Sequence, residues 1–171
     1  VTINAGSNGI QLDTSLNAGT GTVKVNSSAA VSGSADVTAA SLDLSGVSST
    51  TSFTALSAAN VTSVIGGSGA DTLVFTAAGD LTLTAGAGND TVTLTGDNSA
   101  KNVSITGGDG TDTVVFAQGA NFNIGTGKAV VLDVEQLKIT NDNNSSTADL
   151  TIQDSLLSGK SYVLLEANTA A

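Results

Sequence analysis

Three copies of one glycine-rich pattern follow each other in the middle of the chain. Each copy reads G/A-G-x-G-x-D-T-U-x-U, where U is an apolar residue, and the copies begin at Gly66, Ala85 and Gly107. Their aspartates are separated by 19 and then 22 residues. A repeat of about 20 residues is too short to bury its own apolar face, so the pattern predicts a solenoid in which successive repeats stack.

The apolar residues on both sides of each glycine loop fall at equivalent places in the three copies. The shared positions are held by Val64, Leu83 and Ile105 before the loops and by Leu73, Val92, Val114, Phe75, Leu94 and Phe116 after them. Apolar and polar residues alternate here, as they do in a strand with one buried face. Each repeat is therefore predicted to be a strand, a glycine loop and a second strand, and the inward side chains of successive coils should form one narrow core.

Stacking of the coils would place Asp71, Asp90 and Asp112 in one column. Neighbouring strands lie about 4.8 Å apart, and two carboxylates at roughly that spacing repel by about 3 kcal/mol at an effective dielectric constant near 20. The column therefore needs a cation. The glycines permit positive φ and leave backbone carbonyls exposed, and carboxylate plus carbonyl oxygens favour Ca²⁺ over softer metals. The two gaps between successive aspartates predict about two sites; the alternative is that the loops are only turns of a calcium-free β-helix.

The loops resemble the nonapeptide G-G-x-G-x-D-x-U-x of RTX proteins, which forms a calcium-binding parallel β-roll. The resemblance implies an all-β, right-handed parallel β-solenoid in which Asp71, Asp90 and Asp112 bind Ca²⁺. It also implies that backbone carbonyls complete the metal shells, around Gly67, Gly69, Gly86, Gly88, Gly108 and Gly110. Asp109 occupies a variable position of the third loop and is a further candidate, as a ligand or as a solvated neighbour.

The chain also departs from a regular RTX roll. Each coil has one glycine loop instead of one on both sides, and Ala85 replaces the first glycine of the second copy. A calcium column on one side of the solenoid is therefore expected. We predict a solenoid over residues 1–140, with calcium loops at 66–71, 85–90 and 107–112, and capping strands or the start of a next segment over 141–171.

The repeat weakens after the third loop. Residues 125–129 (GTGKA) fall where a fourth loop is expected, with Ala129 in place of the aspartate and Phe122 in the position of Leu83. We interpret this segment as a degenerate loop that ends the calcium column. The sequence Val-Glu-Gln-Leu at 134–137 resembles the strand that follows the repeats in large RTX surface proteins.

Other acidic residues lie outside the glycine loops. Asp13, Asp36 and Asp43 have no glycine pattern around them, and we expect them to be solvated. Fifteen acidic residues against five lysines give a net charge of −10. This negative charge argues against nucleic acid and anionic membranes as partners. It suits a protein whose negative charge is partly neutralised by divalent cations. No apolar stretch is long enough to insert into a membrane, and the absence of cysteine leaves packing or metal to stabilise the fold.

The residues needed for common catalytic chemistry are scarce. The chain has no His, Cys or Arg and five aromatic residues. The usual base for a serine nucleophile and a thiolate nucleophile are therefore both missing. A groove for sugar chemistry is not expected either, since the clustered carboxylates are better explained as calcium ligands. We predict that the chain is not an enzyme.

The function follows from the resemblance and the composition. Abundant Thr, Ser, Ala and Gly, acidity, and the absence of Cys, Met and Trp are typical of RTX-type bacterial surface-layer (S-layer) proteins. The expected protein is secreted by the type I route to the bacterial cell surface, where it assembles with itself into a calcium-dependent lattice, with cell-surface polysaccharide as a further partner of other segments. The alternatives are a calcium-stiffened segment of a large RTX adhesin or matrix protein, and the RTX secretion tail of a hydrolase.

Overall fold

The computed structural model describes residues 1–12, 16–33, 37–57, 61–76, 79–95, 102–117, 122–124, 129–141, 150–152 and 162–167. Within these ranges the regular secondary structure is entirely β, and the strands are paired in parallel. No helix in the described part is long and apolar enough to cross a membrane.

The larger of the two main sheets has nine strands in the order β1-β4-β7-β9-β11-β13-β16-β15-β18. They are β1 (Thr2–Gly6), β4 (Thr22–Ser27), β7 (Ser41–Val47), β9 (Ser63–Ile65), β11 (Leu81–Ala87), β13 (Val103–Asp109), β16 (Ala129–Leu132), β15 (Phe122–Ile124) and β18 (Leu150–Ile152).

The second main sheet has eight strands in the order β19-β17-β14-β12-β10-β8-β5-β2. They are β2 (Ile10–Leu12), β5 (Val31–Gly33), β8 (Thr51–Ser57), β10 (Thr72–Thr76), β12 (Thr91–Thr95), β14 (Thr113–Ala117), β17 (Gln136–Asn141) and β19 (Tyr162–Ala167). Two short strands, β3 (Leu16–Asn17) and β6 (Val37–Thr38), form a separate pair.

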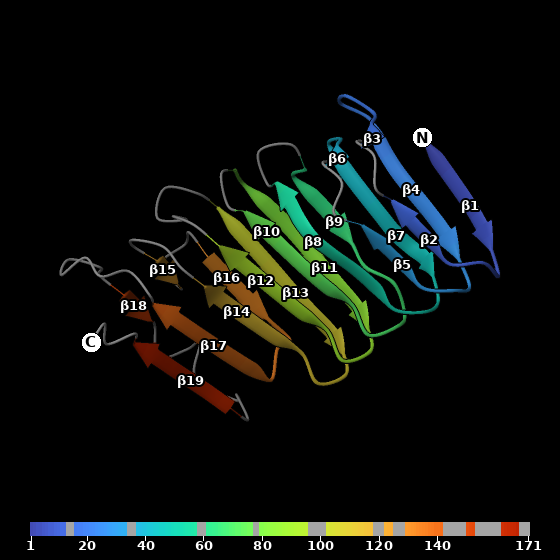
Figure 1. Cartoon of the computed structure of the whole chain (residues 1–171). Helices are drawn as coiled ribbons and strands as arrows, with labels where there is room; N and C mark the ends of the chain where they lie inside the picture. Colours follow the sequence, from blue (N-terminus) through green and yellow to red (C-terminus); the bar gives the residue numbers. More distant parts are fainter. Residues whose placement is uncertain are drawn as a thin grey trace.

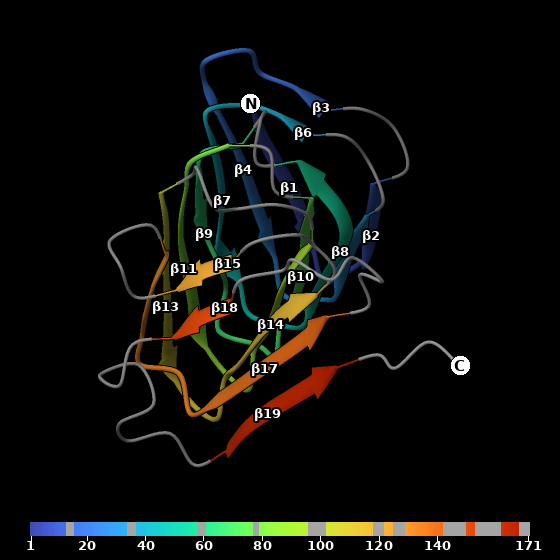
Figure 2. The same ribbon diagram turned by 90° about the vertical axis from the view of Figure 1, so that its left-hand side faces the viewer.

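The chain winds between the two main sheets as it advances. Figure 1 shows the coils stacked side by side from β1 at one end to β19 at the other. In Figure 2 the two main sheets lie on opposite sides of the molecule, and β3 and β6 lie across the gap between them at the first two coils. From β7 to β14 each coil places one strand in each main sheet. The predicted parallel β-solenoid is confirmed.

The core between the sheets is built from the repeated apolar positions. Phe75 pairs with Leu94 in the next strand, and Leu94 pairs with Phe116, so these side chains form one stack. All three are fully buried. In β12 and β14 buried and half-exposed residues alternate, because successive side chains of a strand point to opposite faces. The shared positions predicted on both sides of the loops are thus confirmed as stacks across coils.

The interpretation of the segment after the third loop is wrong. Ala129 begins β16 and pairs with Val103, so it lies before the turn and not at the aspartate position. Phe122 pairs with Leu150 at the far side of β16, and Val131 takes the position next to Ile105. The reason is that β15 is an extra strand, which delays the next coil. Residues 125–128 lie outside the described residues.

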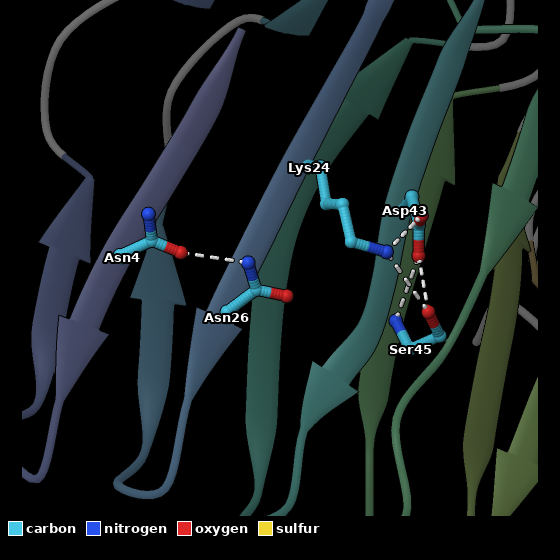
Figure 3. Close-up of polar contacts among 5 residues, drawn as sticks. All are labelled: Asn4, Lys24, Asn26, Asp43 and Ser45. Carbon is cyan, nitrogen blue, oxygen red and sulfur yellow. Dashed lines mark hydrogen bonds and ion pairs between the residues drawn. The ribbon is translucent and has the colours of Figure 1, made fainter.

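Asp43 is also placed differently from the expectation, whereas Asp13 and Asp36 lie outside the described residues. The Asp43 carboxylate accepts hydrogen bonds from Lys24 Nζ at 2.6 Å and from Ser45 N and Oγ at 3.0 and 2.6 Å. Next to this cluster, Asn26 Nδ2 donates to Asn4 Oδ1 at 2.7 Å (Figure 3). These contacts on the outer face of β1, β4 and β7 join neighbouring coils. A partly exposed ion pair of this kind contributes about 1 kcal/mol or less.

Replacement of Leu94 by alanine tests the stacked core. Leu94→Ala removes a side chain packed between two phenylalanines and leaves a cavity, so the free energy of unfolding should fall by about 2–5 kcal/mol. Thr84→Ala, on the exposed face of β11, is the control and should cost less than about 1 kcal/mol. Urea unfolding of both variants measures the difference, and equal losses would contradict the stack.

Candidate metal centre

The three aspartates of the glycine loops lie one above another at the start of successive strands. Thr72 of β10 pairs with Thr91 of β12, and Thr91 pairs with Thr113 of β14. The residue before each of these threonines is the aspartate of its loop. The register therefore aligns Asp71, Asp90 and Asp112 in one column, as the repeat predicts.

Hydrogen bonds run along this column from coil to coil. The Asp71 amide donates to Asp90 Oδ1 at 2.8 Å, and the Asp90 amide donates to Asp112 Oδ1 at 2.9 Å. In the other direction, the Asp71 and Asp90 carbonyls accept from Thr91 N and Thr113 N, both at 2.8 Å. One carboxylate oxygen of each following aspartate thus takes the place of a strand carbonyl, and the column becomes part of the ladder between coils.

The other carboxylate oxygens are not equally satisfied. The three aspartates are only 1–2% exposed. Asp71 Oδ2 accepts the Gly67 amide at 2.9 Å, but Asp90 Oδ2 and Asp112 Oδ2 are buried without a hydrogen-bond partner. A buried carboxylate oxygen without a partner is costly unless a cation or donor reaches it. The second and third loops therefore have the stronger need for a cation.

Burial raises the pKa of all three carboxyls, and like charge raises it as well at Asp90 and Asp112. The pKa of Asp90 is raised to about 6, mainly by burial and also by the neighbouring Asp71 and Asp112 carboxylates, against the hydrogen bond from the Asp71 amide that lowers it. The pKa of Asp71 is raised by burial, partly offset by hydrogen bonds from Thr51 and Gly67. The pKa of Asp112 is raised by burial and, after the opposing Asp90 hydrogen bond, by the charges of Glu135 and Asp109. The ionised column is electrostatically unfavourable without a counter-charge.

The glycines of successive loops stack directly on one another. A Cβ on Gly86 would clash with the Gly67 carbonyl oxygen, and one on Gly108 would clash with the Gly86 carbonyl oxygen. Gly88 lies against Gly69, and a Cβ on Gly110 would clash with the Gly88 carbonyl oxygen. Close approach of one backbone to the next thus explains the predicted glycines, since any larger residue would separate the coils.

The first loop differs from the other two in conformation. Gly86, Gly88, Gly108 and Gly110 have φ between 117° and 139°, a region that residues with a side chain rarely adopt. Gly67 and Gly69 are outside that region. In the first loop the Gly67 amide bonds Asp71 instead. The second and third loops therefore share one geometry. Both have two glycines with positive φ, and in both the aspartate Oδ2 has no hydrogen-bond partner.

The predicted ligand Asp109 is not part of the column. Its side chain is exposed, whereas its carbonyl accepts the Gly88 amide at 2.8 Å. It acts on the column through its charge, which raises the pKa of Asp112. The sequence left two alternatives for Asp109, a metal ligand or a solvated neighbour of the column, and its exposed side chain fits the second.

The donors that surround the column fit Ca²⁺. They are carboxylate and backbone carbonyl oxygens, the hard ligands that Ca²⁺ takes in sets of about six to eight at roughly 2.3–2.6 Å. In the described part of the chain no three acidic side chains converge to hold a metal by themselves. One or two carboxylates must therefore be joined by loop carbonyls. When bound, Ca²⁺ supplies positive charge; the chain's own aspartates and glycine loops supply the oxygen cage and exclude water from it.

Two residues of the column were missed in the sequence analysis. Thr51 occupies the column position one coil before Asp71. Its amide donates to Asp71 Oδ1 at 2.9 Å, and its buried hydroxyl has no hydrogen-bond partner. Glu135 follows the last one, because Thr113 pairs with Gln136. The sequence does carry a signal for Glu135. Residues 135–139 (EQLKI) have an acidic residue followed by apolar residues two and four positions later, as in the D-T-U-x-U part of the repeat. It was overlooked because no glycine loop precedes it.

Comparison with known proteins supports the identification of the repeats. The family model described as RTX calcium-binding nonapeptide repeat (4 copies) matches residues 65–98 and 99–122. These matches include all three glycine loops, so RTX nonapeptide repeats are present in the chain and their cofactor is calcium. No curated protein and no solved structure matches the chain. Which atoms bind the metal stays a prediction, derived from the geometry above.

The raised pKa values predict an unusual pH dependence in chelator. In the folded state the pKa of Asp90 is about 6, whereas the ordinary pKa of an aspartate is 3.8. Because the folded state then binds more protons than the unfolded chain between these values, the free energy of unfolding should fall as the pH rises through them. Between pH 5 and pH 7 the fall should be about 1 kcal/mol or more, measured by urea unfolding.

Asp90→Asn is the control for this dependence. The amide keeps the size and an acceptor for the Asp71 amide but cannot ionise, so the slope between pH 5 and pH 7 should flatten. The remaining slope comes from Asp71 and Asp112, whose pKa values are also raised. A wild-type stability that rises with pH in chelator would contradict the buried column.

Proposed function

We propose that this chain is a calcium-stiffened structural segment of a secreted bacterial surface protein, and that it assembles with itself into a surface layer. The observation that carries the calcium part is the column of buried aspartates, in which Asp90 and Asp112 each keep an unpartnered carboxylate oxygen. Such a solenoid is poorly stable where calcium is scarce and becomes rigid where calcium is abundant. That behaviour suits a protein exported before it folds.

The physical scale of this switch matches an extracellular setting. Extracellular calcium modules have dissociation constants of about 10⁻⁴ to 10⁻³ M. At a free calcium concentration 10 to 100 times the dissociation constant, each site that is absent from the unfolded chain adds about 1.5–3 kcal/mol to the free energy of unfolding. In a domain that is marginally stable without metal, two such sites decide whether the solenoid folds.

The surface-layer part of the proposal is supported by composition and shape. The solenoid is acidic, rich in small and hydroxylated residues, and free of cysteine. Its two parallel main sheets present broad faces on which neighbouring copies can pack (Figure 1). Calcium bridging between acidic copies would complete the lattice. We propose no catalytic role, since the described carboxylates that cluster are the ones assigned to calcium.

A calcium-stiffened adhesin or matrix segment is the second candidate. It is favoured by the ends of the sheets: β1 and β19 are terminal strands with one partner each among the described strands. Further coils can add to such edges in a long fibre. In that case calcium would stiffen the chain without forming a lattice.

A calcium titration of Asp90→Asn tests the calcium part. The wild type should gain several kcal/mol of unfolding free energy in 10 mM calcium, and Asp90→Asn should lose most of the gain because Asp90 lies between both predicted gaps. The matched control is Asp80→Asn, which removes an exposed charge before β11, at the end opposite the loops. Thermal unfolding followed by circular dichroism measures the effect; no change between chelator and calcium in the wild type would overturn the proposal.

The assembly state at saturating calcium separates the candidate functions. A surface-layer protein should form ordered two-dimensional sheets, visible by negative-stain electron microscopy and accompanied by a rise in light scattering. Chelator should disperse them. A chain that folds with calcium but stays monomeric at all concentrations would favour the adhesin segment or the hydrolase tail.

A further inference from the structure

The turn that follows the third glycine loop continues the aspartate column. Thr113 pairs with Gln136, so the residue before Gln136, Glu135, is aligned with Asp112. The Asp112 amide donates to Glu135 Oε2 at 2.8 Å, and the Asp112 carbonyl accepts the Gln136 amide at 2.9 Å. These are the contacts that Asp90 makes with Asp112 one coil earlier. Glu135 thus takes the aspartate position although no glycine loop precedes it.

The two oxygens of each carboxylate face in different directions. Oδ1 of Asp112 accepts the amide of Asp90 in the preceding coil. Oδ2 of Asp112 lies over Gly107, 2.5 Å from the position that a Cβ on Gly107 would take. The same Cβ would clash with the carbonyl oxygen of Asp133, which belongs to the following coil. The free oxygen of Asp112 therefore lies near a carbonyl of the next coil.

The first loop has the same arrangement. A Cβ on Gly66 would lie 3.0 Å from Asp71 Oδ2 and would clash with the carbonyl oxygen of Ala85 in the next coil. In both places an aspartate Oδ2 and a carbonyl of the following coil converge above a glycine without a side chain. If the gap after Asp71 is a calcium position, the gap after Asp112 has the equivalent pair of oxygens.

The conformation of Asp133 positions its carbonyl for this role. Asp133 has φ of 48°, and it is the described non-glycine residue with positive φ. Left-handed backbone is uncommon at a residue other than glycine, although Asp adopts it more readily than most. Its side chain is exposed, so only its backbone reaches the column.

We propose that Asp112, Glu135 and the Asp133 carbonyl form a third calcium site, which closes the C-terminal end of the column. Asp112 is 2% exposed, and its buried Oδ2 has no hydrogen-bond partner and lies where the Asp133 carbonyl approaches. Both oxygens approach the place of a Cβ on Gly107, so they lie near enough to each other for one ion beside Gly107, with bonds of about 2.3–2.6 Å, to contact both. This inference rests on calcium being the cation of the column.

The stoichiometry of calcium binding tests the third site. By isothermal titration calorimetry, Glu135→Gln should bind one calcium fewer than the wild type, or bind one at least tenfold more weakly. Glutamine keeps an acceptor for the Asp112 amide, so the coil should remain paired. Glu166→Gln in β19 is the matched control: it makes the same change of side chain and charge at the chain's other glutamate, which the proposal leaves outside the column. It should bind like the wild type.

A measurement on the unmodified protein covers the case in which Glu135→Gln does not fold. The chain has two glutamates, Glu135 and Glu166. With ¹³C-labelled glutamate carboxyls, calcium should shift the Glu135 signal and leave the other in place, with Glu166→Gln as the assignment variant. Calcium binding by the wild type with no shift at Glu135, or equal stoichiometry in the Glu135 and Glu166 variants, would overturn the third site alone. A wild type that binds no calcium would overturn both this site and the proposed function.

Discussion

Burial of like charges in a single column is the constraint on which this solenoid depends. The parallel register stacks equivalent residues of every coil, so one ionisable residue in the repeat becomes a line of them. Asp71, Asp90 and Asp112 are almost completely buried, and their amides and carboxylates bond from coil to coil. The ladder between coils therefore includes groups whose ionisation opposes folding. A cation between the coils converts this unfavourable line of charge into a cross-link.

The glycine loops are the second half of the same arrangement. Their carbonyls face the glycines of the next coil so closely that any side chain at Gly86, Gly108 or Gly110 would clash. This close stacking sets the distance between coils at the loops to that of the strands, and it brings carbonyl oxygens beside the carboxylates. The apolar stack around Leu94, in the strands that follow the loops, holds the same coils together. The metal loops and the hydrophobic core thus depend on one register.

The fold and the aspartate column could be predicted from the sequence, because aligning the three repeats gives the register of the strands. Aligning the three loops places Leu73 beside Val92 and Phe75 beside Leu94, and the structure has those pairs. The end of the column was not predictable in the same way. An extra strand, β15, delays the next coil, so counting from glycines led to Ala129 whereas the pairing leads to Glu135. Likewise, the sequence makes the three loops equivalent, but only the geometry separates Asp71, which is satisfied by Gly67, from Asp90 and Asp112.

The most direct test of a cation-dependent column is a crystal structure grown in calcium, with anomalous data collected at a long wavelength. The account predicts anomalous peaks within about 2.3–2.6 Å of Asp90 Oδ2 and Asp112 Oδ2, the two buried oxygens that otherwise have no partner. It also predicts that loop carbonyls complete each shell. Well-ordered loops with no peak beside either oxygen, at a calcium concentration that saturates binding in solution, would contradict it.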